Sequence, residues 1–489
     1  MSDRQVQIIL GPPGTGKTTS LLKIVEGALS RGIPPERIAY LAFTRKAAYE
    51  AQERAMQQFN LEEERFPYFR TLHSLAFRML ELKRDDIMTN SHYRRLGKAL
   101  GVKFKGIYDE NLGIHLGDGL GDKCSRIESL ARISMRSLED QYNFTQIPDL
   151  TLHAVRQYDN SLRAYKHEND LLDFTDMLEQ YDAPLPVDIC IFDEAQDMSL
   201  LQYKVAINIA SKAKEVHIAG DDDQAIFTFA GAAINRFLTL KGDRVILPQS
   251  YRIPKAVHKL ALNVVDRIKH RYQKPWSPRM APGMVEYVAD EQQIDFSREG
   301  SWLCLSRSRF LLNRLKAAVR QQGHAYLYNG KNSLETDETR AIKSWEMLRK
   351  GEMITIYDAK NLVQFFGSKV ELATIKEKYS ITDFGFPVSA RDIDWMSMLK
   401  GIAPDEREYL RSCLRNGENF SGKPKITIST IHQSKGGEAD SVVLLTDMGR
   451  LSWENTHKDE ENRVWYVALT RAKENLFLVR PRGLRYYAI

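Results

Sequence analysis

The N-terminal part of the chain contains a glycine-rich segment whose residue types and spacing suit phosphate binding. Residues 11–18 fit the pattern G-x-x-x-x-G-K-[ST], with Lys17 and Thr18 at its end. In such a loop, backbone N–H groups and a helix N-terminus surround a polyphosphate, the lysine reaches the β- and γ-phosphates, and the hydroxyl ligates Mg²⁺. The segment predicts a nucleoside triphosphate site formed by Gly11, Pro12, Pro13, Gly14, Thr15, Gly16, Lys17, Thr18 and Thr19.

A second segment supplies carboxylates that could hydrolyse a bound nucleotide. The apolar run Val187–Phe192 is predicted to be a buried strand, and Asp193 and Glu194 follow it directly. Ligands of open α/β sheets bind at the carboxyl ends of the strands. Asp193 would hold Mg²⁺ together with Thr18, and Glu194 would orient and deprotonate the attacking water. Beside the phosphate loop, these carboxylates favour hydrolysis.

Two blocks of alternating strands and helices must position these groups, which predicts parallel α/β sheets. A strand at Val6–Leu10 leads into the phosphate loop, and a helix over Thr18–Leu29 follows it. The other predicted strands are Ile38–Phe43, Val187–Phe192, Val216–Ala219 and Val245–Leu247 in the first block, and Val285–Val288, Trp302–Leu305, Ile426–Thr430, Val442–Leu445 and Leu476–Val479 in the second. Residues 80–165 and 347–424 are predicted to be mainly helical insertions.

Composition narrows the class of protein. The chain has 489 residues, 43% of them hydrophobic and 27% charged, which is ordinary for a globular protein of several domains. A net charge of +6 permits a nucleic-acid partner without requiring one. The four cysteines are widely spaced, and no run approaches the roughly 18 apolar residues of a membrane span. We therefore expect a cytoplasmic protein with no membrane partner.

Four downstream segments carry a more specific signal. They are Gly-Asp-Asp-Asp-Gln-Ala-Ile-Phe at 220–227, Leu-Pro-Gln-Ser-Tyr-Arg at 247–252, Thr-Ile-His-Gln-Ser-Lys-Gly-Gly-Glu at 430–438 and Tyr-Val-Ala-Leu-Thr-Arg-Ala at 466–472. In this order, after the phosphate loop, they make the chain resemble the superfamily 1A helicases of the UvrD/Rep/PcrA type. The resemblance extends to about residue 480.

The resemblance implies an α/β fold with two RecA-like P-loop domains, each with a parallel sheet and a mainly helical insertion. ATP would lie between the domains and single-stranded DNA across both. The implied parts are domain 1A (1–79 and 166–247), insertion 1B (80–165), domain 2A (248–346 and 425–489) and a reduced insertion 2B (347–424). The segment Leu172–Asp176 resembles a family segment that precedes the strand ending at Asp193, and we interpret it as structural.

The resemblance also implies roles around ATP and Mg²⁺. Arg252 and Arg471 match two arginines that contact the γ-phosphate, and both would come from the second domain, so hydrolysis would require closure of the cleft. Gln224 matches a γ-phosphate sensor. Tyr251 matches an aromatic residue that stacks on adenine, and Glu438 a residue near the ribose. The implied catalytic set is Lys17, Asp193, Glu194, Gln224, Arg252 and Arg471.

Contacts with DNA are implied by further matches. Aromatic residues would stack on bases, and Thr44 or its backbone would hold a phosphate. For each aromatic residue, packing in the core is the alternative interpretation. The implied DNA-binding residues are Phe43, Thr44, Arg45, His73, Phe227, Phe229 and His432.

Three features depart from the family pattern. The family's glutamine-bearing segment, which reads adenine, lies some 20 residues before the phosphate loop, whereas Gln5 and Gln7 here lie on the incoming strand. The family's Trp-Arg-Gly-Ala is Phe-Ala-Gly-Ala at 229–232, which removes an arginine that would face DNA. The insertion at 347–424 is shorter than the family's 2B subdomain.

The function expected from these features is ATP-dependent, 3′-to-5′ movement on single-stranded DNA with unwinding of duplex. Two alternatives stay open: a DNA-stimulated ATPase that translocates without processive unwinding, and a nucleotide-gated subunit of a larger DNA-processing assembly. RNA as the track also stays open. Expected partners are single strands and single-strand/duplex junctions, with replication or repair proteins as candidates, and we expect a monomer.

Overall fold

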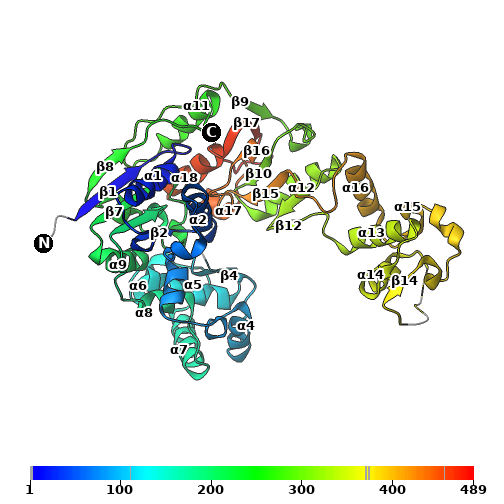
Figure 1. Ribbon diagram of the computed structural model, residues 1–489, viewed down its shortest axis with the longest axis horizontal. Coiled ribbons are helices and arrows are strands. Elements are labelled where there is room, and N and C mark those ends of the chain that lie inside the picture. The colour runs from blue at the N-terminus through cyan, green and yellow to red at the C-terminus, as the bar shows by residue number, and fades with distance from the viewer. Residues whose placement is uncertain (1–3, 111, 369, 371, 373–374, 456) are drawn as a thin grey trace. The chain divides into compact units, whose positions relative to one another are not determined.

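The computed structural model describes residues 4–110, 112–368, 370, 372, 375–455 and 457–489, and it divides into two compact units (Figure 1). Unit 1 comprises Met1–Ala281 and Thr456–Val467, and unit 2 comprises Pro282–Asn455 and Ala468–Ile489. Each unit contains one large sheet. In the described residues, no helix is both long and apolar enough to cross a membrane.

The sheet of unit 1 has six strands, and each strand pairs in parallel with its neighbours. In spatial order they are β3 (Phe69–Thr71), β2 (Ile38–Ala42), β6 (Ile189–Asp193), β7 (Glu215–Gly220), β1 (Gln5–Leu10) and β8 (Asp243–Ile246). Every residue of β2 and β6 is buried, and alternate residues belong to two different hydrophobic cores. This two-faced burial is typical of a parallel sheet with helices on both faces.

Unit 1 also contains helices outside the first insertion. They are α1 (Lys17–Ser30), α2 (Arg45–Phe59), α3 (Leu72–Met79), α8 (Phe174–Gln180), α9 (Leu200–Ile209), α10 (Ile234–Leu238), α11 (Lys255–Val265) and α18 (Lys458–Leu469), in which the chain passes from unit 1 to unit 2. Apolar residues of α1 and α2 share one core with β2 and β6, which fixes the start of α1 next to the sheet edge.

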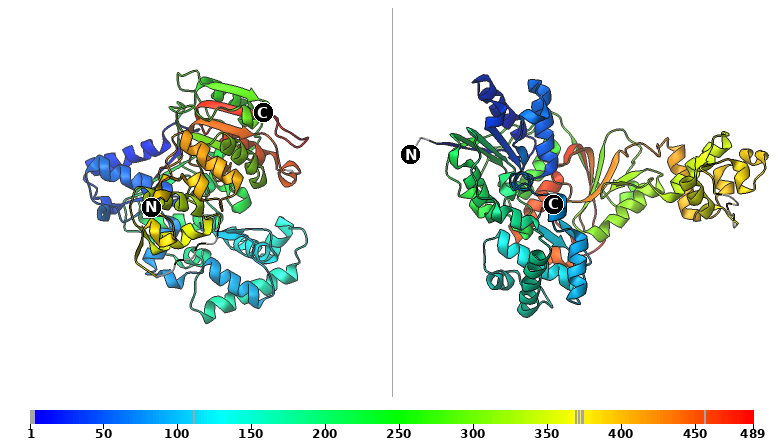
Figure 2. Two further views of the ribbon diagram at one scale, coloured as in Figure 1. Left: turned by 90° about the vertical axis from the view of Figure 1, so that its right-hand side faces the viewer. Right: turned by 60° about the horizontal axis from the view of Figure 1, so that its bottom comes forward.

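The first insertion is mainly helical, as predicted. Its helices are α4 (Asn90–Ala99), α5 (Leu120–Ile133), α6 (Leu138–Thr145) and α7 (Leu152–Glu168), and β4 (Ile107–Asp109) and β5 (Ile114–Leu116) form a small antiparallel ladder. Figure 2 shows these helices, coloured from light blue to teal, gathered on one side of unit 1.

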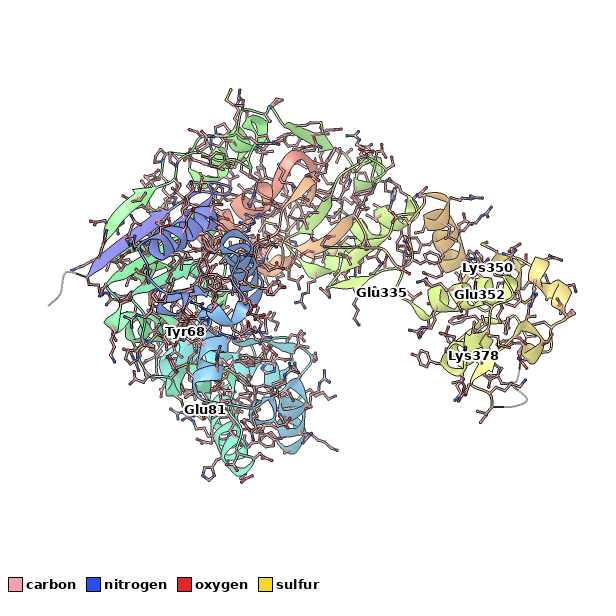
Figure 3. The ribbon with its side chains drawn as sticks, in the orientation of Figure 1. Tyr68, Glu81, Glu335, Lys350, Glu352 and Lys378 are labelled. Atoms are coloured by element: carbon pink, nitrogen blue, oxygen red, sulfur yellow. The ribbon has the colours of Figure 1, made fainter. Side chains whose placement is uncertain are left out.

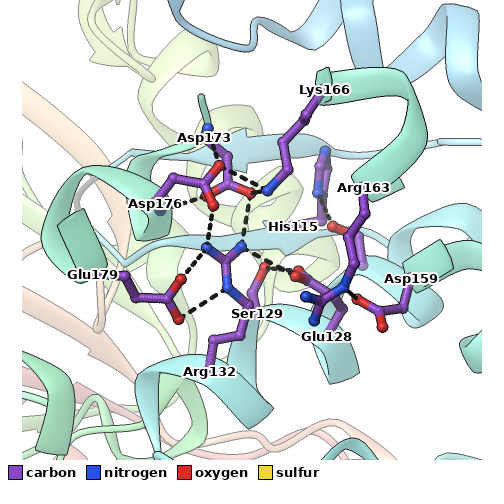
Figure 4. Close-up of polar contacts among 11 residues, drawn as sticks. His115, Glu128, Ser129, Arg132, Asp159, Arg163, Lys166, Asp173, Asp176 and Glu179 are labelled. Carbon is purple, nitrogen blue, oxygen red and sulfur yellow. Dashed lines mark hydrogen bonds and ion pairs between the residues drawn. The ribbon is translucent and has the colours of Figure 1, made fainter. Parts of the chain in front are cut away.

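A buried cluster of charged side chains joins this insertion to α8 (Figure 4). Arg132 of α5 contacts Glu128 at 3.1 Å, Asp173 at 2.8 Å, Asp176 at 2.6 Å and Glu179 at 2.7 Å. Lys166 of α7 contacts Asp173 at 2.6 Å and Asp176 at 2.7 Å. Asp173 also caps α8. The segment Leu172–Asp176, which we interpreted as structural, therefore contributes two carboxylates to the junction between the insertion and the α/β layer. We call these six residues the Arg132 cluster.

The sheet of unit 2 has seven strands, and β11·β12 is its one antiparallel pair. In spatial order they are β12 (Lys331–Asn332), β11 (Tyr326–Tyr328), β15 (Ile426–Thr430), β10 (Trp302–Ser306), β16 (Ala439–Leu445), β17 (Ala472–Val479) and β9 (Met284–Val288). The predicted α/β fold with parallel sheets is confirmed, and a strand forms at each of the ten predicted places. The short strands β3, β11 and β12 were not predicted.

The rest of unit 2 is mostly helical, with a separate hydrophobic core in the second insertion. The elements are α12 (Leu312–Gln321), α13 (Asp337–Arg349), β13 (Ile354–Thr355), α14 (Ile356–Leu362), β14 (Lys378–Tyr379), α15 (Trp395–Met398), α16 (Pro404–Arg415) and α17 (Arg450–Trp453). The insertion core includes Ala341 and Trp345 of α13, before residue 347. Charged side chains such as Lys350, Glu352 and Lys378 are exposed on it (Figure 3).

The two compact units do not coincide with the domain boundaries implied by the sequence. Residues 248–281 belong to unit 1, although the sequence assigned them to the second α/β domain. The domain boundaries stay a prediction.

Candidate nucleotide and nucleic-acid site

The glycine-rich loop lies at the carboxyl edge of the unit 1 sheet. It follows β1, whose neighbours are β7 and β8, and the Gly11 N–H donates to the Gly220 carbonyl at 3.3 Å. Gly14 has a φ of 74°, and a Cβ there would lie 2.4 Å from the Cβ of Arg252. Position 14 therefore requires glycine both for its backbone conformation and for its close neighbour.

The start of α1 fits a polyphosphate. Its N-cap is Gly16, which has a φ of 80° and offers no side-chain cap, and its first turn carries no acidic residue. Lys17 Nζ donates to the Gly11 carbonyl at 2.8 Å, so the ammonium lies across the loop. Backbone N–H groups at a helix N-terminus and a nearby ammonium are what a phosphate chain requires. The loop's own residues thus fit the nucleotide predicted for it.

The two predicted metal ligands lie together. Thr18 Oγ1 donates to Asp193 Oδ2 at 3.4 Å, and Tyr40 Oη donates to the same carboxylate oxygen at 2.7 Å. Burial, and then the neighbouring Glu194, raise the pKa of Asp193 to about 6. A hydroxyl and a carboxylate are hard oxygen ligands of the kind Mg²⁺ prefers, and a cation would relieve the repulsion that raises this pKa.

Glu194 and Gln224 belong to one chain of hydrogen bonds at the ends of β6 and β7. Gln196 Nε2 donates to Glu194, while Gln196 Oε1 accepts from the Asp221 N–H at 3.0 Å. Gln224 Nε2 donates to Asp221 Oδ2 at 2.7 Å. Glu194 itself has a φ of 55°, an uncommon conformation for a residue other than glycine. The structure therefore brings the predicted water-activating carboxylate and the predicted sensor into one network.

The segment with Tyr251 and Arg252 contacts the phosphate loop directly. Ser250 Oγ donates to the Pro13 carbonyl at 2.8 Å, and the Tyr251 N–H donates to the Gly14 carbonyl at 2.8 Å. The Tyr251 side chain is 74% exposed next to the loop, which suits stacking on a base. Arg252 thus lies in the same compact unit as the loop, whereas Arg471 lies in unit 2.

Three predicted site residues lie in unit 2. Arg471 is buried and donates to the Gly437 carbonyl at 3.0 Å, next to the exposed Glu438. Burial, with Arg307 and Lys435 nearby, lowers the pKa of His432 to about 3, so this imidazole is neutral at physiological pH.

The predicted DNA-binding residues of unit 1 form a row of aromatic rings. Phe43, after β2, stacks on Phe227 with ring centroids 5.7 Å apart, and Phe227 lies 6.3 Å from Phe229, which is 45% exposed. Phe43, His73 and Phe227 line one pocket. Burial, and then Arg45, lower the pKa of His73 to about 4, so this imidazole is also neutral at physiological pH.

The two predicted polar contacts after β2 already have partners. Thr44 Oγ1 accepts from the Ala47 N–H at 3.2 Å and so caps α2, and Arg45 contacts Glu110 of the insertion at 2.8 Å. The Arg45–Glu110 pair is well exposed, so it could exchange for a phosphate at little cost. Gln7 Oε1, on β1, accepts a hydrogen bond from His217 Nδ1 at 3.0 Å within the sheet.

Sequence reasoning missed several residues that hold the site. Tyr40 was placed in a strand without a role, and Ser250 and Gln196 lay inside recognised segments but were given none. Lys274 and Arg271, which contact the Asp221–Asp223 loop, carried no local signal. Their proximity to that loop depends on the return of the chain after α11.

Comparison with known proteins agrees with this geometry. The UvrD/REP helicase N-terminal domain matches residues 2–244, and the UvrD-like helicase C-terminal domain matches residues 425–479. The chain belongs to the UvrD/Rep helicase family. The first match includes the loop, the acidic strand end and the aromatic row, and the second includes His432, Glu438 and Arg471.

Individual relatives are distant but extend over much of the chain. YjcD of Bacillus subtilis is 24% identical over 98% of this chain and 77% of its own length. The ATP-dependent DNA helicase Rep of Buchnera aphidicola subsp. Acyrthosiphon pisum is 22% identical over 96% of this chain and 92% of its own length. The ATP-dependent DNA helicase UvrD1 of Mycobacterium tuberculosis is 26% identical over 60% of this chain and 43% of its own length.

Proposed function

We propose that this protein is an ATP-dependent DNA helicase that moves 3′-to-5′ on single-stranded DNA and unwinds duplex. The observation that carries the proposal is the loop after β7. Within four residues it holds Gln224, which is hydrogen-bonded in the nucleotide network, and Phe227, which is stacked on Phe43. A shift at one end of so short a segment must move the other, which would couple hydrolysis to a step along a strand.

The nucleotide chemistry follows from the residues at the sheet edge. Bound Mg²⁺–ATP would supply the phosphoanhydride to be cleaved and a cation that neutralises charge on its oxygens. Thr18 and Asp193 would hold the cation, and Lys17 would turn from the Gly11 carbonyl to the phosphates. Glu194 would orient the attacking water, and Gln224 would sense whether the γ-phosphate is present.

Further residues would complete the set of contacts with the nucleotide. Arg252 would contact the γ-phosphate from beside Gly14, Arg471 would contact the same phosphate, and Glu438 would lie near the ribose. Tyr251 would stack on adenine, a role supported by its exposed ring beside the loop. Because Gln7 is bonded to His217, adenine recognition would rest mainly on Tyr251.

DNA would be held by stacking and by its backbone. Stacking on Phe43, Phe227 and Phe229 ignores base identity, as a motor that moves on any sequence requires. His73 and His432 are neutral at physiological pH, so they would act as hydrogen-bond donors to the strand and not as cations. Thr44 would contact a phosphate through its backbone, since its hydroxyl caps α2. We propose that the protein works as a monomer at single-strand/duplex junctions.

Unwinding of tailed duplexes tests this function. We expect ATP-dependent strand separation of a duplex with a 3′ single-stranded tail, little separation with a 5′ tail, and none by a Glu194→Gln variant. Equal activity on both tails would contradict the polarity. ATP-driven movement on single strands without strand separation would favour the translocase alternative. Stimulation of ATP hydrolysis by RNA but not by DNA would identify RNA as the strand along which the protein moves.

A further inference from the structure

Lys274 lies in a fully buried position among three aspartates of the loop that carries Gln224. Its Nζ is 3.2 Å from Asp221 Oδ1, 2.5 Å from Asp222 Oδ1 and 2.9 Å from Asp223 Oδ2. The side chains of Lys274, Asp221 and Asp222 have no exposed surface, and that of Asp223 is 1% exposed. The spacing of the three carboxylates would suit a metal ion, but the ammonium of Lys274 contacts all three.

The chain around Lys274 holds the same loop at further points. Arg271 donates to both oxygens of Asp223, at 2.7 and 2.6 Å, and the Tyr272 N–H donates to Asp222 Oδ2 at 2.8 Å. Arg463 of α18 donates to the Asp222 carbonyl at 2.8 Å. The segment after α11 therefore fixes the backbone and the charges of the Asp221–Asp223 turn.

Asp221 connects the contacts made by Lys274 to Gln224, the predicted γ-phosphate sensor. Its Oδ1 contacts Lys274 and accepts from the Asp223 N–H at 3.2 Å, while its Oδ2 accepts from Gln224 Nε2 at 2.7 Å. Burial opposes ionisation of Asp221, but the charges of Lys274 and Lys17, together with hydrogen bonds from Gln224 and Lys274, lower the pKa of this carboxyl. An ionised carboxylate can only accept hydrogen bonds, so it fixes which end of the Gln224 amide faces it.

We propose that Lys274 is a positioning residue for ATP hydrolysis, which acts through Asp221 to orient Gln224. This inference rests on the function proposed above. Lys274 does not touch the nucleotide in this account. It keeps Asp221 ionised and in place, and Asp221 holds the Gln224 amide with its oxygen turned away from the carboxylate. Without the ammonium, three buried carboxylates would face one another, and the turn that carries Gln224 would rearrange.

A double-mutant cycle between Lys274 and Gln224 tests this inference. The variants are Lys274→Met, Gln224→Ala and both together, assayed for ATP turnover at saturating single-stranded DNA. We expect Lys274→Met to lower kcat about 100-fold, the scale of an ångström-level misplacement, with KM for ATP within threefold of wild type. We expect the double variant to be no slower than Gln224→Ala, since both act on one group. Losses that multiply, or an unchanged kcat in Lys274→Met, would overturn the inference.

Further variants distinguish a role of Lys274 in positioning Gln224 from a role in folding. Asp221→Ala removes the connection but leaves Lys274 paired with Asp222 and Asp223, so it should reproduce the loss of kcat with a smaller loss of thermal stability. Lys259→Met, at an exposed lysine of α11, is the matched control and should change neither. Normal turnover by a folded Asp221→Ala variant would overturn the inference.

A readout that is independent of hydrolysis distinguishes this inference from the proposed function. In a crystal structure of the Lys274→Met variant, we expect the Gln224 amide to have left Asp221 Oδ2. A retained Gln224–Asp221 hydrogen bond would overturn the inference even if the wild-type protein hydrolyses ATP. Wild-type protein without DNA-stimulated turnover would instead contradict the proposed function, whatever the position of Gln224.

Discussion

Two buried clusters of charged side chains in unit 1 differ in what they hold. The Lys274 cluster, which consists of Lys274, Asp221, Asp222 and Asp223, fixes a turn at the carboxyl edge of the sheet, one hydrogen bond away from Gln224. The Arg132 cluster joins α5 and α7 to α8 (Figure 4). Burial is deeper in the Lys274 cluster, whose side chains are at most 1% exposed, than in the Arg132 cluster, where Arg132 is 12% and Glu179 40% exposed.

Perturbed pKa values do not separate the two clusters. Burial raises the pKa of Glu128, in the Arg132 cluster, to about 7, although Arg132 opposes the shift. Burial likewise raises the pKa of Asp223, in the Lys274 cluster, to about 6, although Lys274 opposes the shift. Structural ion-pair networks and functional sites both shift titrations. The Lys274 cluster is assigned a role in the chemistry because Asp221 accepts a hydrogen bond from Gln224, and the Arg132 cluster is assigned a structural role.

The largest expected effect comes from substitution of Lys17, in the phosphate loop at the carboxyl edge of the sheet. Lys17→Ala should abolish ATP turnover, because the ammonium of Lys17, expected at the γ-phosphate, has no substitute in the loop. Folding and single-strand binding should be largely retained. Steady-state ATPase and DNA-binding assays measure this, with Lys23→Ala, an exposed lysine of the same helix, as the control. Substantial turnover by Lys17→Ala would place the nucleotide elsewhere.

Substitutions in the Arg132 cluster should lower the stability of the fold and leave the kcat for ATP hydrolysis unchanged. Arg132→Met leaves four carboxylates with Lys166 as their remaining cation within the cluster, and we expect a loss of about 3–5 kcal/mol in the free energy of unfolding. The exposed pair Arg163–Asp159 offers a control, since Arg163→Met should cost at most about 1 kcal/mol. Denaturant unfolding measures both. A loss of kcat in folded Arg132→Met protein would mean that this cluster also supports the reaction.

Substitutions in the aromatic row, formed by Phe43, Phe227 and Phe229, should weaken DNA binding and leave ATP binding unchanged. Phe227→Ala should weaken single-strand binding by about 1–3 kcal/mol, the usual contribution of one stacking platform. The KM for ATP should be unchanged. Fluorescence anisotropy with a labelled strand measures the affinity, and Tyr287→Ala, a 56% exposed tyrosine of β9, is the control. Unchanged affinity would assign Phe227 to core packing.

A pH dependence of stability is also expected from Glu128. Its pKa is raised from 4.5 to about 7 in the folded protein, so its contribution is present below pH 4.5 and is lost as pH rises through 7. Glu128→Gln should therefore gain stability relative to wild type between pH 4.5 and 7. Unfolding curves across this range test the sign. A difference that is constant with pH would show that Arg132 keeps Glu128 ionised throughout.

Local patterns in the sequence predicted much of the site, and contacts between distant segments were harder to predict. The loop at 11–18 and the strand ending at Asp193 are contiguous signals, and both lie where the pattern placed them. Lys274 and Tyr40 acquire roles only because the chain returns to the sheet edge, and neither has a spacing that reveals it. The packing of Arg252 on Gly14 likewise depends on the path after β8. The hydrophobic core of the second insertion begins before residue 347 because α13 packs into it. The exposed face of the insertion is charged, so no signal in the sequence marks where that core begins.

The most direct test of the account is ATP hydrolysis by the purified protein with and without single-stranded DNA, with Glu194→Gln as the control. The account predicts strong stimulation by the strand that disappears in the variant, because the loop after β7 connects Gln224 to the aromatic row. Hydrolysis that is indifferent to single-stranded DNA would contradict that coupling.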